Sequence, residues 1–588
     1  MPDAPAPSST SRPAPARRRA RGLAAVVAVL GLLVACTGGA TDDASPSPSP
    51  TPTVLRATVT LPEAPVTVVP DASAGETAVV VSGALFDEAP VAVLVAGEDA
   101  TLLGPAATAA VGLGAPLLVA GAPGTAEEVA RLGSTEAVVV GDADLDGLPA
   151  DLRTHAVDDA DALADLGVDV GDRQDVAPTA LTAAVAALTR PATPLLVSDD
   201  SEAPAPEASA PVTDGPSAAP STTGGLGAEG TTVEPPAEVE HAALLVDSVT
   251  GSAAATVAAA TARAAGVPVV DVPGGDPRAT PATVQALTGV STVLAVGSTF
   301  GAAELLGPRV ASAATGVELP GGGQLVFPVA GSAPGLHAKR YIALYGTPGT
   351  PALGVLGEQD VPATIARAQQ TAAPYDAMTD DTVVPTLEII ATVASAAPEP
   401  DGSYSRGRSV DELRPLVEAA AEAGQAVVID LQPGRTDFLT QAQRYADLLA
   451  YPHVGLALDP EWRLQPDQVH LRQIGSVGVD EVNATAAWLA QFTRERQLPQ
   501  KMFLLHQFSL RMIAERERLD TSHDELAVII HADGQGSQPA KAGTWAALRQ
   551  GAPPVHWGWK NFYDEDTPML DPAQTWQVQP VPDLVTYQ

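Results

Sequence analysis

The chain has 588 residues, a length that permits three or four domains. It carries 70 Asp and Glu residues against 32 Lys and Arg residues, which gives a formal net charge of −38. Because nucleic acids and other phosphate polymers are bound by basic surfaces, this charge excludes nucleic acid as a partner.

An arginine-rich segment and a short apolar run open the chain. Arginine occupies four of the five positions 17–21, and the apolar run covers residues 22–35. This run is shorter than the ~20 residues of a membrane-spanning helix, but it is typical of a signal-peptide core. The chain therefore predicts an exported protein.

The apolar run ends in Leu-Val-Ala-Cys, and this cysteine, Cys36, is the only one in the chain. The segment resembles the lipobox of bacterial lipoproteins. The resemblance implies that residues 1–36 are a signal peptide with its lipobox and that Cys36 is lipidated. The protein would then be anchored through lipid to the outer face of the cell membrane. An ordinary signal peptide with an unmodified Cys36 is the alternative.

Two stretches of low complexity separate the predicted domains. Residues 37–74 begin with a Ser/Pro/Thr-rich segment and are predicted to be a tether. Residues 199–238 are rich in Pro, Ser, Gly and Glu and are predicted to be a disordered linker. The flanking segments, 75–198 and 239–332, are predicted to be two α/β repeat domains.

Each repeat reads as strand, Ala-rich helix, Gly-x-Pro turn, strand, helix and a strand that ends in Gly. Gly114-Ala115-Pro116 in the first copy corresponds to Gly266-Val267-Pro268 in the second. Alternating strands and helices predict parallel sheets with right-handed crossovers. Neither copy has the Gly-rich motif of a nucleotide-binding fold after its first strand.

The repeats resemble the cell wall-binding repeat 2 family over residues 75–330. The resemblance rests on the Gly-x-Pro turns and on the closing strands that end in Gly141 and Gly297. The Phe-Pro-Asp-Ala-Leu segment typical of that family is absent. The resemblance implies cell-envelope polysaccharide as a partner. A spacer that presents the C-terminal domain is the alternative.

Residues 335–588 alternate strands and helices at barrel-like spacing. Seven strands are predicted, at residues 340–346, 383–390, 426–430, 454–459, 501–507, 526–534 and 555–560. This rhythm predicts a (β/α)8 TIM-like barrel with an eighth strand still to be located. A doubly wound open sheet is the alternative. The fold class predicted for the whole chain is α/β, with parallel-sheet repeats followed by the barrel.

Acids, imidazoles and aromatic residues follow the predicted barrel strands. Barrel active sites lie at the carboxyl ends of the strands, so these residues are candidates for one cleft. The catalytic candidates are Asp430, Asp459, Glu461, Glu388 and Asp533. The substrate-binding candidates are Trp462, His506, His531, Trp557, Trp559 and Lys560.

Carboxylates combined with aromatic rings in an exported barrel indicate glycan chemistry, since one acid can protonate the leaving oxygen while another acts as nucleophile or base. The domain resembles glycoside hydrolase-like barrels in architecture alone, because no family signature such as Asn-Glu-Pro is present. The predicted function is hydrolysis or binding of cell-envelope glycans, with no cofactor.

Two alternatives to a carboxylate-based glycosidase stay open. One is a non-catalytic barrel that binds wall glycan through Trp462, Trp557 and Trp559. The other is a metal-dependent hydrolase with His506, His531, Asp533 and Asp430 as ligands around an activated water. No His-Glu-x-x-His motif supports the metal alternative, and no metal site is assigned.

Overall fold

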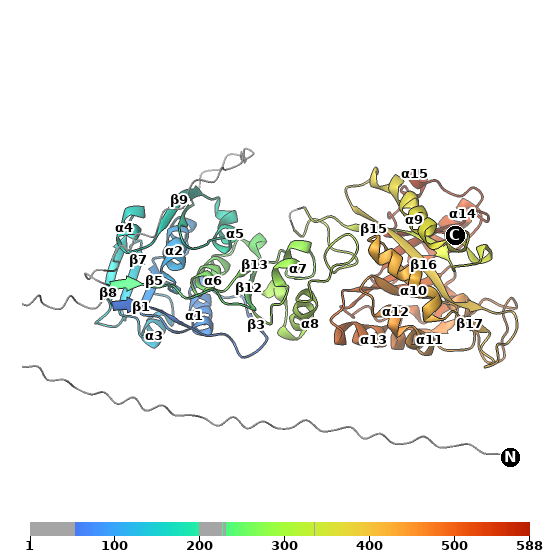
Figure 1. Cartoon of the computed structure of the whole chain (residues 1–588), viewed down its shortest axis with the longest axis horizontal. Helices are drawn as coiled ribbons and strands as arrows, with labels where there is room; N and C mark the ends of the chain where they lie inside the picture. Colours follow the sequence, from blue (N-terminus) through green and yellow to red (C-terminus); the bar gives the residue numbers. More distant parts are fainter. Residues whose placement is uncertain (1–52, 199–225, 227–230, 334) are drawn as a thin grey trace, which may run out of the picture. The chain divides into compact units, whose positions relative to one another are not determined.

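A computed structural model describes residues 53–198, 226, 231–333 and 335–588 (Figure 1). The predicted signal peptide with Cys36 and the first part of the predicted tether lie outside the described residues. So does most of the predicted linker at 199–238. Among the described residues, no helix combines the length and the apolar character needed to cross a membrane.

The folded region begins before the predicted boundary at residue 75. Three short strands precede it: β1 (Thr53–Leu55), β2 (Thr58–Val59) and β3 (Val66–Val69). They pair with β11 (Thr231–Val233), with β4 (Phe86–Glu88) and with the last strand of the second repeat, respectively. Residues 53–69, which the composition assigns to the tether, thus belong to the α/β region.

The two repeats adopt the same order of elements, as predicted. The first consists of β5 (Val91–Val95), α2 (Ala100–Leu113), β6 (Leu117–Val119), α3 (Thr125–Arg131) and β7 (Glu136–Val140). The second consists of β12 (Ala242–Val246), α6 (Ala253–Ala264), β13 (Val269–Asp271), α7 (Pro281–Leu287) and β14 (Thr292–Val296). Gly114 and Gly266 follow α2 and α6 at φ 63° and 78°, a left-handed conformation that glycine adopts without steric cost.

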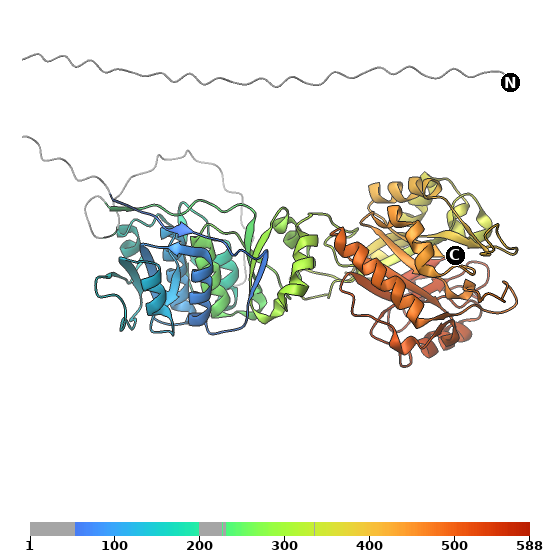
Figure 2. The same cartoon turned by 90° about the horizontal axis from the view of Figure 1, so that it is seen from below.

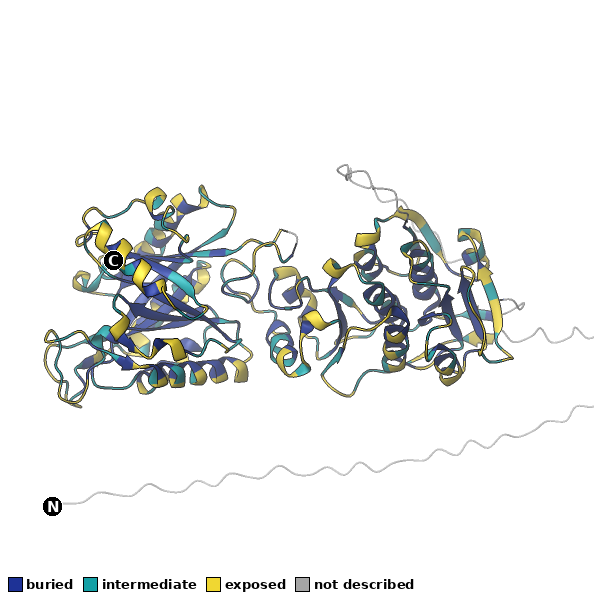
Figure 3. Ribbon diagram, turned by 180° about the vertical axis from the view of Figure 1, so that it is seen from behind, coloured by how far each residue is buried: buried dark blue, intermediate teal, exposed yellow. Residues whose placement is uncertain are grey.

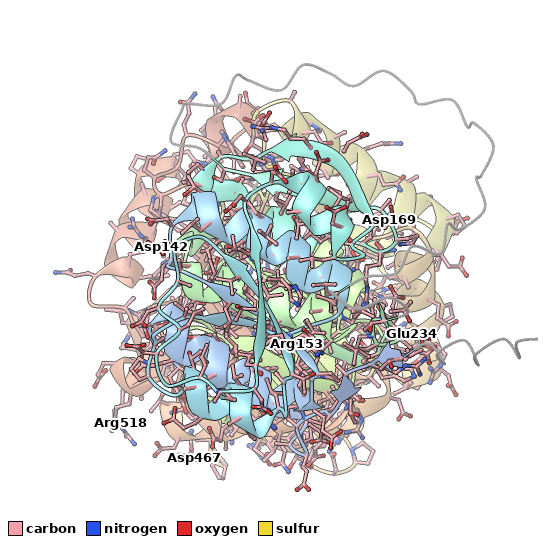
Figure 4. The ribbon with its side chains drawn as sticks, turned by 90° about the vertical axis from the view of Figure 1, so that its left-hand side faces the viewer. Asp142, Arg153, Asp169, Glu234, Asp467 and Arg518 are labelled. Carbon is pink, nitrogen blue, oxygen red and sulfur yellow. The ribbon has the colours of Figure 1, made fainter. Side chains whose placement is uncertain are left out.

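Each repeat builds a four-stranded parallel sheet. The strand orders are β6-β5-β7-β8 and β13-β12-β14-β3, with β8 at Arg153–Val157. The remaining elements of this region are α1 (Ala74–Leu85), α4 (Ala160–Asp165), β9 (Val170–Asp175), α5 (Leu181–Ala186), β10 (Thr193–Val197) and α8 (Ala303–Ala313). Charged side chains such as Asp142, Arg153 and Asp169 are exposed on this region (Figure 4).

The two repeats share one hydrophobic core. A single cluster of buried residues runs from Val69 to Val296 and includes both α2 and α6. The Thr261 hydroxyl of α6 accepts a hydrogen bond from the Leu117 amide of β6 at 3.2 Å. Alanine-rich helix faces allow this close approach, because their side chains are small. The repeats therefore form one folded unit in which each supports the other.

The C-terminal region is a closed barrel of eight parallel strands, as predicted (Figure 1, yellow to red). The strands are β15 (Lys339–Gly346), β16 (Thr382–Ala394), β18 (Ala426–Leu431), β19 (Val454–Leu458), β21 (Lys501–Gln507), β23 (Leu526–Ala532), β24 (His556–Asn561) and β25 (Leu584–Tyr587). Each pairs with the next in chain order, and β25 pairs with β15 to close the ring. The strand β25 is the eighth strand that the sequence left unlocated.

Helices cover the outer side of this barrel (Figure 2). They are α9 (Val361–Asp376), α10 (Val410–Glu422), α11 (Phe438–Arg444), α12 (Ala446–Leu449), α13 (Val479–Glu495), α14 (Gln538–Arg549) and α15 (Pro572–Thr575). A capping box begins α10, because the Ser409 hydroxyl accepts from the Glu412 amide at 3.2 Å and the Glu412 carboxylate accepts from the Ser409 amide at 2.7 Å. Three short strands complete the domain: β17 (Ser405–Gly407), β20 (Val477–Gly478) and β22 (Ile513–Ala514).

The barrel strands alternate between two buried layers (Figure 3, dark blue). One set of side chains packs under the helices, and the other fills the barrel interior. Largely apolar side chains, among them those of Tyr341, Val428 and Leu504, fill the interior over the amino-terminal and middle parts of the strands. Because alternate residues of a strand face the same side, the next inward position on each strand comes at its carboxyl end. Those positions are polar.

Candidate active site

A layer of polar side chains lies where the inward positions reach the carboxyl ends of the barrel strands. Its members are each at most 3% exposed: Tyr345, Glu388, Asp430, His506, His531, Lys560 and Thr586. The register supports this common level, because Tyr345 pairs with Glu388 and His506 pairs with His531 on neighbouring strands. We refer to these seven residues as the floor.

A cavity of about 500 Å³ opens above the floor. The carboxyl groups of Asp459, Glu461 and Asp533 line it, together with that of the exposed Glu565. Aromatic rings from Trp462, Phe508 and Phe562 line it as well. We refer to this cavity as the cleft. A cleft at the carboxyl ends of barrel strands is where TIM-barrel enzymes place their active sites.

The stretch that follows β19 supplies two of the cleft carboxyl groups. Asp459 is the residue directly after the strand and is 2% exposed. The chain then turns into a 3-10 helix at Pro460–Trp462, which Pro460 favours at its first position. Glu461 and Trp462 reach the cleft from this turn rather than by strand alternation. Pro460 thus redirects the chain at the edge of the cleft.

His506 connects the floor to the cleft. Its Nδ1 lies 3.0 Å from Asp533 Oδ2, and its Nε2 lies 2.7 Å from Glu388 Oε1. Glu388 is held in turn by the Thr586 hydroxyl, which donates to Oε2 at 3.0 Å. Asp430 accepts from the Tyr345 hydroxyl at 2.8 Å. Neighbouring side chains therefore hold both carboxylates of the floor in place.

The carboxyl groups of the site divide into two classes by pKa. Burial, reinforced by the charge of Asp533, raises the pKa of Glu461 to about 7. Burial and then Glu461 raise the pKa of Asp459 well above its usual range. Burial opposes ionisation of Asp533 too, but the hydrogen bond from His506 holds its pKa below the usual value. The cleft therefore combines protonated and ionised carboxyl groups near neutral pH.

The floor shows the same division. Burial alone would raise the pKa of Glu388, but the charge of His506 lowers it to about 2. Burial raises the pKa of Asp430 to about 6. The pKa of His506 lies well above its usual value, because Glu388 and Asp430 outweigh its burial. Burial lowers the pKa of His531 to about 3, so this imidazole is neutral.

The structure brings most of the predicted site residues together, in two groups. Asp459, Glu461, Asp533, Trp462 and Lys560 line the cleft. Glu388, Asp430, His506 and His531 lie in the floor and do not line the cleft. They reach it through Asp533, to which His506 is bound.

Two predicted substrate-binding residues lie elsewhere. Trp557 and Trp559 pack with Trp545 of α14, at ring-centroid distances of 5.7 and 5.6 Å. Strand alternation explains the difference, because the inward positions of β24 are Gly558 and Lys560. The two tryptophans therefore face the helices, and their prediction as cleft residues is corrected.

Several residues of the site were not predicted from the sequence. Tyr345 and Thr586 belong to the floor, and Phe508 and Phe562 line the cleft. Strand alternation offered a signal for two of them, since Tyr345 is two residues beyond Ala343 of the interior and Phe508 is two residues beyond His506. Thr586 carried no signal, because its strand was not located. Lys560 Nζ lies 3.6 Å from the centroid of the Tyr345 ring, a cation–π contact.

No protein-family model matches the chain, and no curated protein matches it. Among solved structures, it is similar to CcCel6C, a glycoside hydrolase family 6 enzyme from Coprinopsis cinerea, at 15% identity. That similarity covers 37% of this chain and 60% of that chain, with a TM-score of 0.18, which supports no functional argument. The resemblance to cell wall-binding repeat 2 modules stays a prediction.

Proposed function

We propose that the C-terminal barrel hydrolyses glycosidic bonds. The observation that carries this proposal is the cleft itself, in which several carboxyl groups and aromatic rings line one cavity of about 500 Å³. Glycoside hydrolysis requires a pair of carboxyl groups in different protonation states on either side of the scissile bond. Sugar rings in turn stack on aromatic faces.

Glu461 is the general acid in this proposal. It lines the cleft, and its raised pKa of about 7 keeps a proton available near neutral pH. The proton goes to the oxygen of the departing sugar as the bond from that oxygen to the anomeric carbon breaks. Asp459 is more deeply buried beside Glu461, and its own raised pKa limits the negative charge there.

Asp533 is the partner carboxylate. The hydrogen bond from His506 engages Oδ2, while Oδ1 has no hydrogen-bond partner among the described protein groups. An ionised carboxylate with one oxygen held and the other unengaged suits attack on the anomeric carbon or activation of a water. His506 is a positioning residue, since it acts through Asp533.

Trp462 forms part of the wall that would contact the sugar. Its indole Nε1 is buried and has no hydrogen-bond partner among the described protein groups. An indole N–H donates hydrogen bonds only, so a sugar hydroxyl is a suitable acceptor. Phe508 and Phe562 supply apolar faces in the same cleft.

Release of reducing ends by the full chain tests this function. Cell-envelope glycans and storage α-glucans would be incubated with wild-type protein and with Glu461→Gln and Asp533→Asn. Glu422→Gln on α10 and Asp447→Asn on α12 are matched controls, because both residues are exposed. We expect release by wild type and controls but not by the cleft variants. Retention of a glycan without any release would favour the binding module instead.

We also propose that Cys36 carries a lipid anchor at the outer face of the cell membrane, which would place the barrel near cell-envelope glycans. The lipobox-like sequence at residues 33–36 supports this. Metabolic labelling with a palmitate analogue tests it. We expect label in the wild-type protein and none in Cys36→Ala, and an equal label in both would contradict the proposal.

A further inference from the structure

Beneath the cleft, polar atoms of four floor residues converge, and among the described protein groups only the close pair of Glu388 and His506 offers any of them a partner. These atoms are Glu388 Oε1, Asp430 Oδ1, His506 Nε2 and His531 Nδ1, and their residues are at most 1% exposed. Glu388 Oε1 lies 2.7 Å from His506 Nε2 and 3.8 Å from His531 Nδ1. His506 Nε2 lies 3.7 Å from Asp430 Oδ1.

Leaving such atoms unsatisfied is costly. A buried polar group without a partner destabilises a protein by about 1–3 kcal/mol. His531 is the clearest case, because both of its ring nitrogens are buried and neither has a hydrogen-bond partner among the described protein groups. The floor therefore contains buried polar atoms whose missing interactions a ligand bound there would supply.

We propose that the floor binds a divalent metal ion of the Zn²⁺ class through Glu388, His506 and His531, with Asp430 as a fourth ligand. Ligand atoms of the first three residues lie within 4.8 Å of one another. Atoms that share a tetrahedral Zn²⁺ at 2.0–2.2 Å lie about 3.3–3.6 Å apart. The observed separations of 2.7 to 3.8 Å bracket that value.

The surrounding contacts are those of a second coordination shell. Metal-bound histidines usually donate their other ring N–H to a carboxylate, which fixes the tautomer and the ring orientation. His506 has this arrangement, since Nδ1 is bound to Asp533 and Nε2 points to the convergent group. Glu388 and Asp430 follow the same pattern, with one oxygen held by Thr586 or Tyr345 and the other facing the convergent group.

The charges around the floor favour a cation as well. The carboxyl groups of Glu388, Asp430, Asp459 and Asp533 are each at most 8% exposed, and the ammonium group of Lys560 lies among them. An excess of buried carboxylates is unfavourable unless a positive charge offsets it. Two imidazoles with carboxylates suit Zn²⁺ and related transition ions better than Mg²⁺ or Ca²⁺.

This ligand set differs from the one that the sequence suggested. His506, His531 and Asp430 were candidates in the metal-dependent alternative, together with Asp533. The structure instead places Asp533 against the far nitrogen of His506 and puts Glu388 among the ligands. The site does not depend on the proposed glycosidase function, since none of its four ligand residues lines the cleft.

Zn²⁺ binding by the purified full chain tests the proposal without any activity assay. The protein would be treated with EDTA, dialysed and titrated with Zn²⁺ by calorimetry, and Co²⁺ absorption would report the coordination. We expect one tight site per chain and at least a ~100-fold loss of affinity in Glu388→Gln and in His531→Ala. We expect a ~10–100-fold loss in Asp533→Asn, because its carboxylate orients a ligand.

His556→Ala is the matched control, because His556 is half-exposed and is bound to Asp583 away from the floor. Its affinity for Zn²⁺ should equal that of wild type. Circular dichroism would establish that each variant is folded. Absence of a stoichiometric site in the wild type overturns the proposal whatever the variants do. Equal binding by wild type and a folded Glu388→Gln does so too, since it would mean adventitious binding by surface carboxylates only.

Discussion

His506 Nδ1 lies 3.0 Å from Asp533 Oδ2, so an imidazole of the barrel floor holds a carboxylate of the cleft. The contact lowers the pKa of Asp533 against the effect of its burial. It also leaves the other carboxylate oxygen, Oδ1, without a hydrogen-bond partner among the described protein groups. In the proposed mechanism, the reactivity of the cleft thus depends on a residue that does not line it.

Loss of this contact should impair catalysis without removing a cleft group. We expect His506→Gln to lower kcat by about 10²–10⁴, the range for loss of acid–base function, because Asp533 would no longer be held and ionised. The acidic limb of the kcat–pH profile should move to higher pH, since Asp533 loses the group that lowers its pKa. Steady-state kinetics across pH measure both effects. An unchanged acidic limb would show that His506 has only a structural role.

Activity should fall on the alkaline side of pH ~7. Glu461 must be protonated to act as the acid, and its pKa is raised to about 7. The charge of Lys560 lowers the pKa of Glu461, so Lys560→Met should raise this pKa further and shift the alkaline limb of the pH–activity profile to higher pH. Arg444→Met, at an exposed position of α11, is the control and should leave the limb in place. A shift to lower pH in Lys560→Met would contradict the assignment of Glu461.

The same carboxyl group should make the fold less stable at high pH. The pKa of Glu461 rises from its usual 4.5 to about 7 on folding, so its contribution to stability is fully present below pH 4.5 and is lost as the pH passes 7. Glu461→Gln removes this loss. Urea unfolding should therefore find the variant more stable than wild type by about 1–3 kcal/mol at pH 8 and similar to it at pH 4. Equal differences at the two pH values would exclude this linkage.

Gly558 should be required for the position of His531. A Cβ at residue 558 would lie 2.7 Å from His531 Cδ2 and 3.3 Å from its Cα. Gly558→Ala should destabilise the protein by about 1–3 kcal/mol, as overpacking of a core does. Gly543→Ala within α14 is the control, because its Cβ would meet nothing within 4 Å and Ala favours a helix. Thermal unfolding of both variants decides the matter, and equal effects would contradict the close packing at His531.

The sequence predicted much of the barrel because its strands and helices alternate at regular intervals along the chain. Seven strands were located within a few residues, and the rule that barrel sites lie at strand carboxyl ends brought Asp459, Glu461 and Asp533 to one cleft. The eighth strand escaped because Leu584–Tyr587 is short and its polar Thr586 interrupts an apolar run.

Other features depended on contacts that no local pattern encodes. The pairing of β3 with β14 joins residues more than two hundred positions apart, so Val66–Val69 could not be assigned to a sheet from its own sequence. Trp559 faces the helices because Lys560 takes the inward position, and the two assignments differ by a single residue of register. The division between floor and cleft depends on how far below the cavity each inward-facing side chain lies. Strand alternation shows which side chains face inward but not how deep they lie.

The role of Glu461 as general acid is the central claim, and the leaving-group dependence of hydrolysis tests it most directly. Two aryl glycosides of the sugar found to be cleaved would be compared, one with a strongly acidic phenol that departs without protonation and one with a weakly acidic phenol. We expect Glu461→Gln to hydrolyse the activated substrate at a rate near that of wild type, and to lose about 10²–10⁴-fold on the other, because only the latter needs the proton. An equal loss on both substrates would contradict the account.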